Sequence, residues 1–265
     1  MPRLAVEIFV IANLGFLALD VFIAHEVNAF ERWPEWIPFY FSLAAPLLLV
    51  IGLFLRRAHT ALSFLVGWCS LAVGIAGMVF HLQSHFFGEE TLKSLVYTAP
   101  FIAPLAYAGL GLLLIMDRMT DSESIEWAQW VVFLALGGFA GNFVLSLADH
   151  AQNGFFNRAE WIPVVAAALG CAFLLVVVTR PDDRTLLRAT VTVMVVEMIV
   201  GAAGFAYHLR GNLAQPSPRL WDRFLYGAPI FAPLLFANLA LLALLGIWAL
   251  TRSRSGAPAP SPVPA

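Results

Sequence analysis

Long apolar runs recur from one end of this 265-residue chain to the other, separated only by short polar breaks. A helix needs about 20 mostly apolar residues to cross the hydrocarbon core of a bilayer, and the runs leave no length for a sizeable soluble domain. Charged residues make up 12% of the chain, against about 25% in an average soluble domain. The pattern predicts an all-α integral membrane protein with eight transmembrane helices. The expected spans are 4–24, 37–55, 61–80, 97–116, 127–148, 162–179, 189–207 and 226–250.

Charge is sparse along the chain. The net charge is −2 and no basic stripe is present, so the sequence lacks the electrostatic footprint of a nucleic-acid-binding protein. Of the 15 lysines and arginines, nine lie on the face shared by both termini and six on the other. Because short cytoplasmic loops carry the excess of basic residues, we expect both termini in the cytoplasm, in a bacterial inner (cell) membrane. His59, in a turn on that face, is expected to be solvated. The lipid bilayer is the expected partner, together with other membrane subunits.

The sequence repeats itself in three blocks that keep their order. Seven of fourteen residues match in the first block, five of nine in the second and five of eight in the third. The paired blocks are 25–38 with 150–163, 74–82 with 201–209, and 97–104 with 226–233. A duplicated unit with an even number of spans gives parallel copies, related by a pseudo-twofold axis along the membrane normal. We expect one four-helix repeat over 1–120, a second over 121–252, and a disordered Pro/Ala/Ser-rich tail over 253–265.

Four histidines end the expected first, third, fifth and seventh spans. These spans run in the same direction, so the imidazoles are expected at one depth, near the non-cytoplasmic face. Imidazole is the commonest protein ligand for copper, zinc and haem iron. The pattern indicates either metal or haem ligation, in one central site or one per half, or interfacial imidazoles hydrogen-bonded to carbonyls or headgroups. The four residues are His25, His81, His150 and His208.

A pair of glycines precedes the histidine in each copy of the second block, by seven and four residues. Residues at this spacing share one face of a helix. A bare face beside a ligand could admit a flat porphyrin, or it could let two membrane helices pack closely. The sequence leaves both interpretations open. The pairs are Gly74/Gly77 and Gly201/Gly204.

Three acids lie within or at the ends of expected spans. Glu197 stands eleven residues, about 16 Å along a helix, before the histidine of its own span, near the membrane midplane. A carboxyl there indicates either a proton relay or a protonated acid hydrogen-bonded between helices. Asp20 precedes His25 by five residues, and Asp149 directly precedes His150. Either acid could fix the tautomer of a metal-binding imidazole, or be a solvated acid at a helix end.

Tyr97 and Tyr226 open the expected fourth and eighth spans, at the histidine face. Tyrosines are common at membrane interfaces, and either hydroxyl is also a candidate for a proton relay. Each tyrosine is followed by two prolines, which remove backbone donors and leave carbonyls that neighbours must satisfy or that line a cavity. The proline pairs are Pro100/Pro104 and Pro229/Pro233.

A duplicated pair of four-helix bundles with histidines at equivalent positions is similar in plan to the haem A synthase family. That resemblance implies a haem-binding membrane protein. The sequence departs from the family pattern in two ways. The family carries its histidines on even-numbered helices within a Glu-x-x-x-His feature, whereas here they end odd-numbered spans, and Val21 stands at the matching offset before His25.

Three classes of function follow from these features. The first is a membrane-embedded haem- or metal-binding protein for electron transfer or redox chemistry near the outer face, with the four histidines as ligands to haem b or to a copper or zinc ion. The second is a small-solute or ion transporter with a pathway at the repeat interface, close to Glu197. The third is a non-catalytic membrane subunit or assembly factor.

Overall fold

The computed structural model describes residues 2–55 and 57–255, and helices make up 81% of the structure. No described residue belongs to a strand. The elements are α1 (Pro2–Glu26), η1 (Trp33–Glu35), α2 (Trp36–Phe54), α3 (His59–Gln83), α4 (Phe86–Glu89), α5 (Leu92–Tyr97), α6 (Leu105–Met119), α7 (Ile125–Gln152), η2 (Arg158–Glu160), α8 (Trp161–Thr179), α9 (Arg184–Leu213), α10 (Leu220–Leu225) and α11 (Leu234–Ser255).

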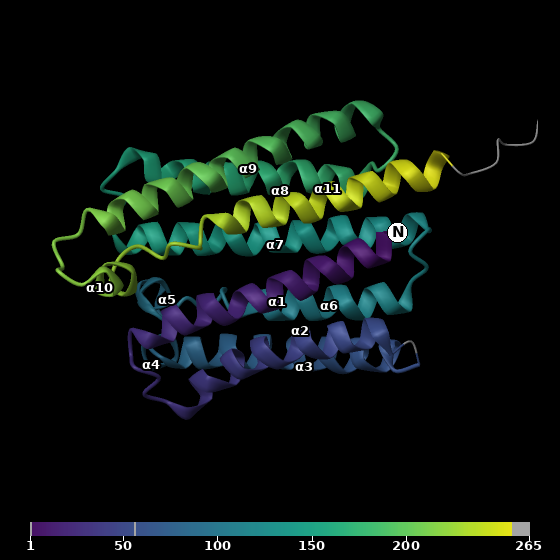
Figure 1. The fold of residues 1–265 in the computed structure, drawn as a ribbon. Coiled ribbons are helices and arrows are strands. Elements are labelled where there is room, and N and C mark those ends of the chain that lie inside the picture. The colour runs from purple at the N-terminus through teal and green to yellow at the C-terminus, as the bar shows by residue number, and fades with distance from the viewer. Residues whose placement is uncertain (1, 56, 256–265) are drawn as a thin grey trace, which may run out of the picture.

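Seven of these helices are long and apolar enough to cross a membrane, namely α1, α2, α3, α7, α8, α9 and α11. Many of their large apolar side chains are exposed, as expected for helices that face lipid; Ile199, for example, is 62% exposed. An all-helical integral membrane protein, the coarse form of the prediction, is therefore confirmed. The short helices α4, α5 and α10 gather at one end of the bundle, whereas the start of α1 and the end of α11 lie at the other (Figure 1).

The expected fourth and eighth spans begin later than predicted. Residues 98–104 and 226–233 are not helical, and α6 and α11 start directly after the second proline of each pair. The reason is that Pro104 and Pro233 cannot donate the i→i−4 hydrogen bond that would extend the helix backwards. As a result α6 has only 15 residues and is not among the seven candidate spans. At the other end, α11 includes residues 253–255 of the expected tail, and 256–265 lie outside the described residues.

The long helices form two rings of four. In the first ring α1 packs on α2, α2 on α3, α3 on α6 and α6 on α1; in the second α7 packs on α8, α8 on α9, α9 on α11 and α11 on α7. The rings meet where α6 contacts α7 and α1 contacts α11. At the α1–α11 contact Asn13 and Asn238 exchange two amide hydrogen bonds, of 3.2 and 2.5 Å. Such bonds hold helices together in an apolar solvent.

The repeated glycines are packing positions. A Cβ on Gly74 would lie 2.5 Å from the backbone nitrogen of Ala108, and one on Gly77 would lie 2.8 Å from the Cβ of Pro104. In the second ring Gly201 and Gly204 meet Pro233 in the same way, with would-be contacts of 2.8 Å to its carbonyl oxygen and 2.8 Å to its Cβ. The glycine faces of α3 and α9, which could have admitted a porphyrin, are therefore filled by α6 and α11 and by the prolines that precede these helices.

Gly74→Ala should destabilise the protein, because the added methyl group meets backbone rather than a flexible side chain. We expect a cost of about 1–3 kcal/mol, the usual range for overpacking. Thermal unfolding in detergent measures it, with Gly15→Ala as the matched control, since a Cβ on Gly15 of α1 has nothing within 4 Å. Equal midpoints for the two variants would contradict the packing role.

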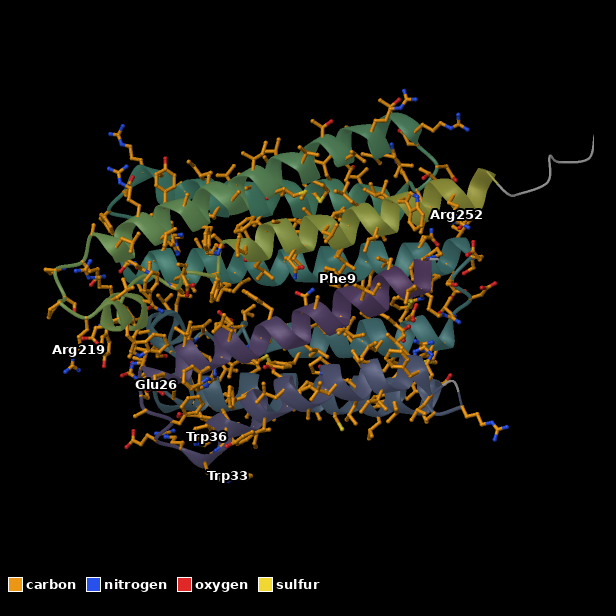
Figure 2. The ribbon with its side chains drawn as sticks, in the orientation of Figure 1. Phe9, Glu26, Trp33, Trp36, Arg219 and Arg252 are labelled. Atoms are coloured by element: carbon orange, nitrogen blue, oxygen red, sulfur yellow. The ribbon has the colours of Figure 1, made fainter. Side chains whose placement is uncertain are left out.

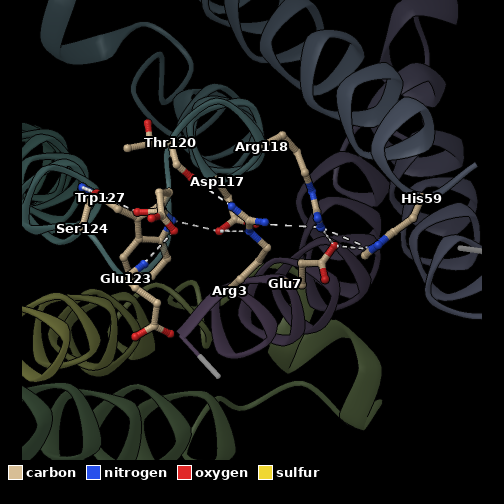
Figure 3. Close-up of polar contacts among 10 residues, drawn as sticks. Arg3, Glu7, His59, Asp117, Arg118, Thr120, Glu123, Ser124 and Trp127 are labelled. Atoms are coloured by element: carbon tan, nitrogen blue, oxygen red, sulfur yellow. Dashed lines mark hydrogen bonds and ion pairs between the residues drawn. The ribbon is translucent and has the colours of Figure 1, made fainter. Parts of the chain in front are cut away.

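A buried group of charged side chains ties α1, α3 and α6 together at the end where α1 begins (Figure 3). Glu7 is 3% exposed, and its Oε1 accepts a hydrogen bond from Nη2 of Arg118 and lies 2.6 Å from Nε2 of His59. The expectation of a solvated His59 is wrong. Its partner Glu7 lies 52 residues away in the sequence, so no local pattern could indicate the contact.

Asp117 extends this group to α7. Its carboxylate is fully buried, accepts a 3.0 Å hydrogen bond from the indole of Trp127, and lies 3.8 Å from Nε of Arg3. Arg3 in turn donates to the backbone carbonyl of Thr120 over 2.9 Å, just before the loop that leads into α7. These contacts join the first ring to the start of the second (Figure 3).

Candidate functional site

The four histidines lie at one end of the bundle, opposite the start of α1. His25, His81 and His150 are in the last turns of α1, α3 and α7, and His208 is five residues from the end of α9. In Figure 2 this end of the bundle is found by the labels of Glu26 and Trp36, and the opposite end by the label of Arg252. Two of the histidines, His25 and His81, are in contact within the first ring, and the other two lie in the second ring within electrostatic range of each other.

In the first ring the imidazole rings of His25 and His81 face each other edge to face, with 6.2 Å between ring centres. Nδ1 of His81 lies 2.9 Å from the carbonyl oxygen of Pro100, and Nδ1 of His25 lies 3.0 Å from that of Val21, one turn earlier in α1. A carbonyl oxygen can only accept, so both Nδ1 atoms carry the proton. In each neutral ring Nε2 then keeps a free lone pair.

In the second ring Nδ1 of His208 lies 2.8 Å from the carbonyl oxygen of Pro229, which is the counterpart of the contact between His81 and Pro100. His150 is within electrostatic range of His208. Its Nδ1 is 3.7 Å from Oε2 of Glu160, an ion-pair distance. The first ring of helices therefore holds two imidazoles in contact, and in the second ring His150 and His208 interact electrostatically.

The proline pairs explain why a histidine finds this carbonyl. In a continuous helix the carbonyl of Pro100 would accept from residue 104, and that of Pro229 from residue 233, but both donors are replaced by proline. The unsatisfied carbonyl is costly in an apolar surrounding. His81 and His208 supply the missing donor. The sequence indicated that neighbouring groups satisfy these carbonyls or that the carbonyls line a cavity. The neighbouring groups are the two histidines.

The connections that follow His25 and His150 have the same shape. Phe30 and Phe155 both adopt a positive φ of 50°, which is uncommon for a bulky residue. Each donates its backbone N–H to the carbonyl of the preceding histidine, over 3.2 and 3.1 Å. The aromatic side chain of each phenylalanine stacks on a tryptophan at the start of the next helix. The ring centres are 4.0 Å apart for Phe30 and Trp36 and 4.1 Å apart for Phe155 and Trp161. This fold positions the residues just before α2 and α8 beside the histidines.

Two glutamates in these connections are site residues that sequence reasoning missed. Glu35 ends η1 and is within electrostatic range of His81, and Glu160 ends η2 beside His150. Oε2 of each glutamate is buried and has no hydrogen-bond partner. The signal was present, because Glu35 and Glu160 are an identical pair within the first repeated block. Each histidine pair thus has one nearby carboxylate with an oxygen that accepts no hydrogen bond.

The other predicted site residues differ in how close they lie to these pairs. Asp20 interacts electrostatically with His25. The carboxylate at ion-pair distance from His150 is that of Glu160, whereas Asp149 lines a small cavity of about 10 Å³ next to Pro100. The side chains of Tyr97 and Tyr226 are 54% and 65% exposed, which suits an interfacial position. Glu197 is separate, midway along α9.

Within residues 2–55 and 57–255 no group of three or more His, Cys, Asp or Glu side chains is placed to hold a metal ion. The two imidazoles and the glutamate of each ring are neighbours, and they do not converge on one point. Comparisons with protein-family models, with curated proteins and with solved structures found no match.

Proposed function

We propose that the chain is a membrane-embedded metal protein built from two parallel four-helix repeats, 1–120 and 121–252, with one metal site in each. His25 and His81 with Glu35 form the first site, and His150 and His208 with Glu160 form the second. The observation that carries the proposal is the duplicated bond from a histidine Nδ1 to a proline carbonyl. This bond holds the imidazole with its Nε2 lone pair available. Histidines that bind metals usually donate their other ring N–H in this way.

Three features of the structure support the repeat. The two helix rings have the same internal contacts, in the same order. The contact between α6 and α7 has its counterpart in the one between α11 and α1, as a pseudo-twofold axis requires. The connections after His25 and His150 share their positive φ values and their stacked aromatic pairs. In this arrangement α6 is the fourth of eight spans, shortened by its proline-containing start.

The spacing of the imidazoles supports one ion per half. Two imidazoles bound to one ion through metal–nitrogen bonds of about 2.0–2.1 Å have ring centres roughly 5–6 Å apart. The 6.2 Å between the ring centres of His25 and His81 is close to that range. Closing the site requires the glutamate carboxylate to turn toward the Nε2 atoms of the imidazoles. Two imidazoles and one carboxylate suit zinc, copper or iron.

The chemistry depends on which ion is bound. Copper or iron in these sites would allow electron transfer near the outer face, whereas zinc has no redox chemistry and, with three protein ligands and an open fourth position, would act as a Lewis acid. A bare ion is favoured over haem b because the repeated glycine faces beside His81 and His208 are filled by Pro104 and Pro233. We place the sites on the non-cytoplasmic side of a bacterial inner membrane, with both termini in the cytoplasm, from the distribution of basic residues.

The metal content of the purified protein tests this function. The full chain, purified in detergent from cells grown with added zinc, copper and iron, is expected to hold two transition-metal ions per chain by elemental analysis. Its absorption spectrum should lack the Soret band of a haem. A protein that stays free of metal after incubation with each ion, or one that contains haem, would overturn the proposal.

A further inference from the structure

A groove of about 490 Å³ opens between α8 and α9, on the outside of the second helix ring. Its volume is in the range of small-molecule sites. Its walls are almost entirely apolar side chains, including Val165, Leu169 and Val196, and Trp161 lies at its histidine end. The same three wall residues are 54%, 48% and 49% exposed, so the groove is open toward the surface that faces lipid.

Glu197 is the acidic residue in the lining of this groove. Its side chain is 1% exposed, and Oε2 is buried without a hydrogen-bond partner. The residue lies eleven positions before His208, about 16 Å along α9, and therefore deep in the apolar part of the bilayer. A polar atom at this depth with no partner is costly. A bound molecule could remove the cost.

The first helix ring differs at the position of Glu197. The counterpart of Glu197 is Ser70, which is fully buried, and its hydroxyl donates to the backbone carbonyl of Tyr107 over 2.7 Å. The polar atom at this position of α3 is therefore satisfied within the protein. At this position of the repeat the unpaired carboxyl occurs in the second half alone, so it is not a requirement of the shared fold.

We propose that the groove between α8 and α9 binds a neutral, hydroxyl-bearing lipid whose hydroxyl group donates a hydrogen bond to Glu197. A carboxyl accepts hydrogen bonds whether or not it is protonated, so a donor is the matching group. A charged ammonium donor is excluded by the cost of placing it at this depth. The apolar walls and the opening to lipid suit an alkyl or prenyl chain that enters from the bilayer. This site does not depend on the metal sites.

A photoactivatable probe tests the proposal. The full chain in phosphatidylcholine nanodiscs is labelled with a diazirine derivative of hexadecanol and, separately, with its methyl ether, which cannot donate. Mass spectrometry of the peptides is expected to show about fivefold more alcohol than ether on α8 and α9, the effect of one hydrogen bond. Equal labelling by the two probes would overturn the proposal.

Variants locate the bond and the groove. Glu197→Leu should reduce the labelling by the alcohol to that of the ether, while Glu197→Gln should retain it, because the amide oxygen still accepts. Val196→Trp fills the groove and should abolish the labelling. Ile199→Trp is the matched control, since Ile199 is on the same helix, 62% exposed and outside the groove lining. If Glu197→Leu does not fold, the alcohol-to-ether ratio of the wild-type chain and the two tryptophan variants still test the proposal.

Competition identifies the kind of lipid. An unlabelled prenyl alcohol, a quinol or a diacylglycerol is added at increasing concentration, and the loss of labelling on α8 and α9 is measured. Displacement by one of them supports the proposal and names the source of the hydroxyl group. Failure of all three to displace the alcohol probe would contradict it.

Discussion

His81→Ala should lower the metal content of the purified protein from two ions per chain to one, and His208→Ala should do the same. Each substitution removes one of the two imidazoles of a site. Loss even of a residue that only orients a ligand typically lowers metal affinity 10–100-fold, so loss of the ligand itself should cost at least about 100-fold. The double variant should hold no metal. Elemental analysis with equilibrium dialysis measures these numbers.

A second substitution at the same position separates metal binding from folding. His81→Gln retains a side-chain N–H that can reach the carbonyl of Pro100, so it should keep the thermal unfolding midpoint closer to wild type than alanine does, yet lose the ion. His85→Ala is the control, because His85 is exposed at the start of α4. If either His81 variant retained two ions, the assignment of His81 as a ligand would be wrong.

Glu7→Ala should unfold the protein much more easily than wild type. It removes the carboxylate that is hydrogen-bonded to the guanidinium of Arg118, whose side chain is only 6% exposed, and leaves Asp117, 3.8 Å away, as the remaining ion-pair partner. Breaking a buried ion pair from one side costs about 3–5 kcal/mol. Thermal unfolding or denaturation in SDS gives the loss.

A matched surface pair provides the comparison. Glu123 and Arg252 lie 3.7 Å apart with side chains 54% and 45% exposed, so Glu123→Ala should cost less than about 1 kcal/mol. The double variant Glu7→Met with Arg118→Met should be more stable than Glu7→Ala alone, because it leaves no uncompensated charge. Equal losses for Glu7→Ala and Glu123→Ala would contradict the stabilising role of the buried pair.

The apolar runs predicted the helices well, because a bilayer leaves a chain few alternatives to them. Where the prediction failed, proline was the cause. Residues 98–104 and 226–233 belong to runs with the composition of membrane spans, but their paired prolines prevent helix formation and leave α6 short. Hydropathy averaged over a window does not register the loss of single backbone donors.

The candidate site was predicted in part. The repeat identified His25, His81, His150 and His208, and the direction of the spans placed them at one end. Which histidines pair, and within which ring, depends on helix packing that no local pattern contains. Glu35 and Glu160 were missed because they stand in connections rather than in spans, although their identity in the repeat was a usable signal. The same limit applies to Glu7 and His59, which meet across 52 residues.

X-ray absorption spectroscopy on the metal-loaded protein tests the central claim most directly, because it reports the atoms bound to the ion. The account predicts two imidazole nitrogens at about 2.0–2.1 Å and at least one carboxylate oxygen at a similar distance. It also predicts the same spectrum from His81→Ala, whose remaining site is intact, and from His208→Ala. A shell of water oxygens alone, or the four nitrogens of a porphyrin, would contradict it.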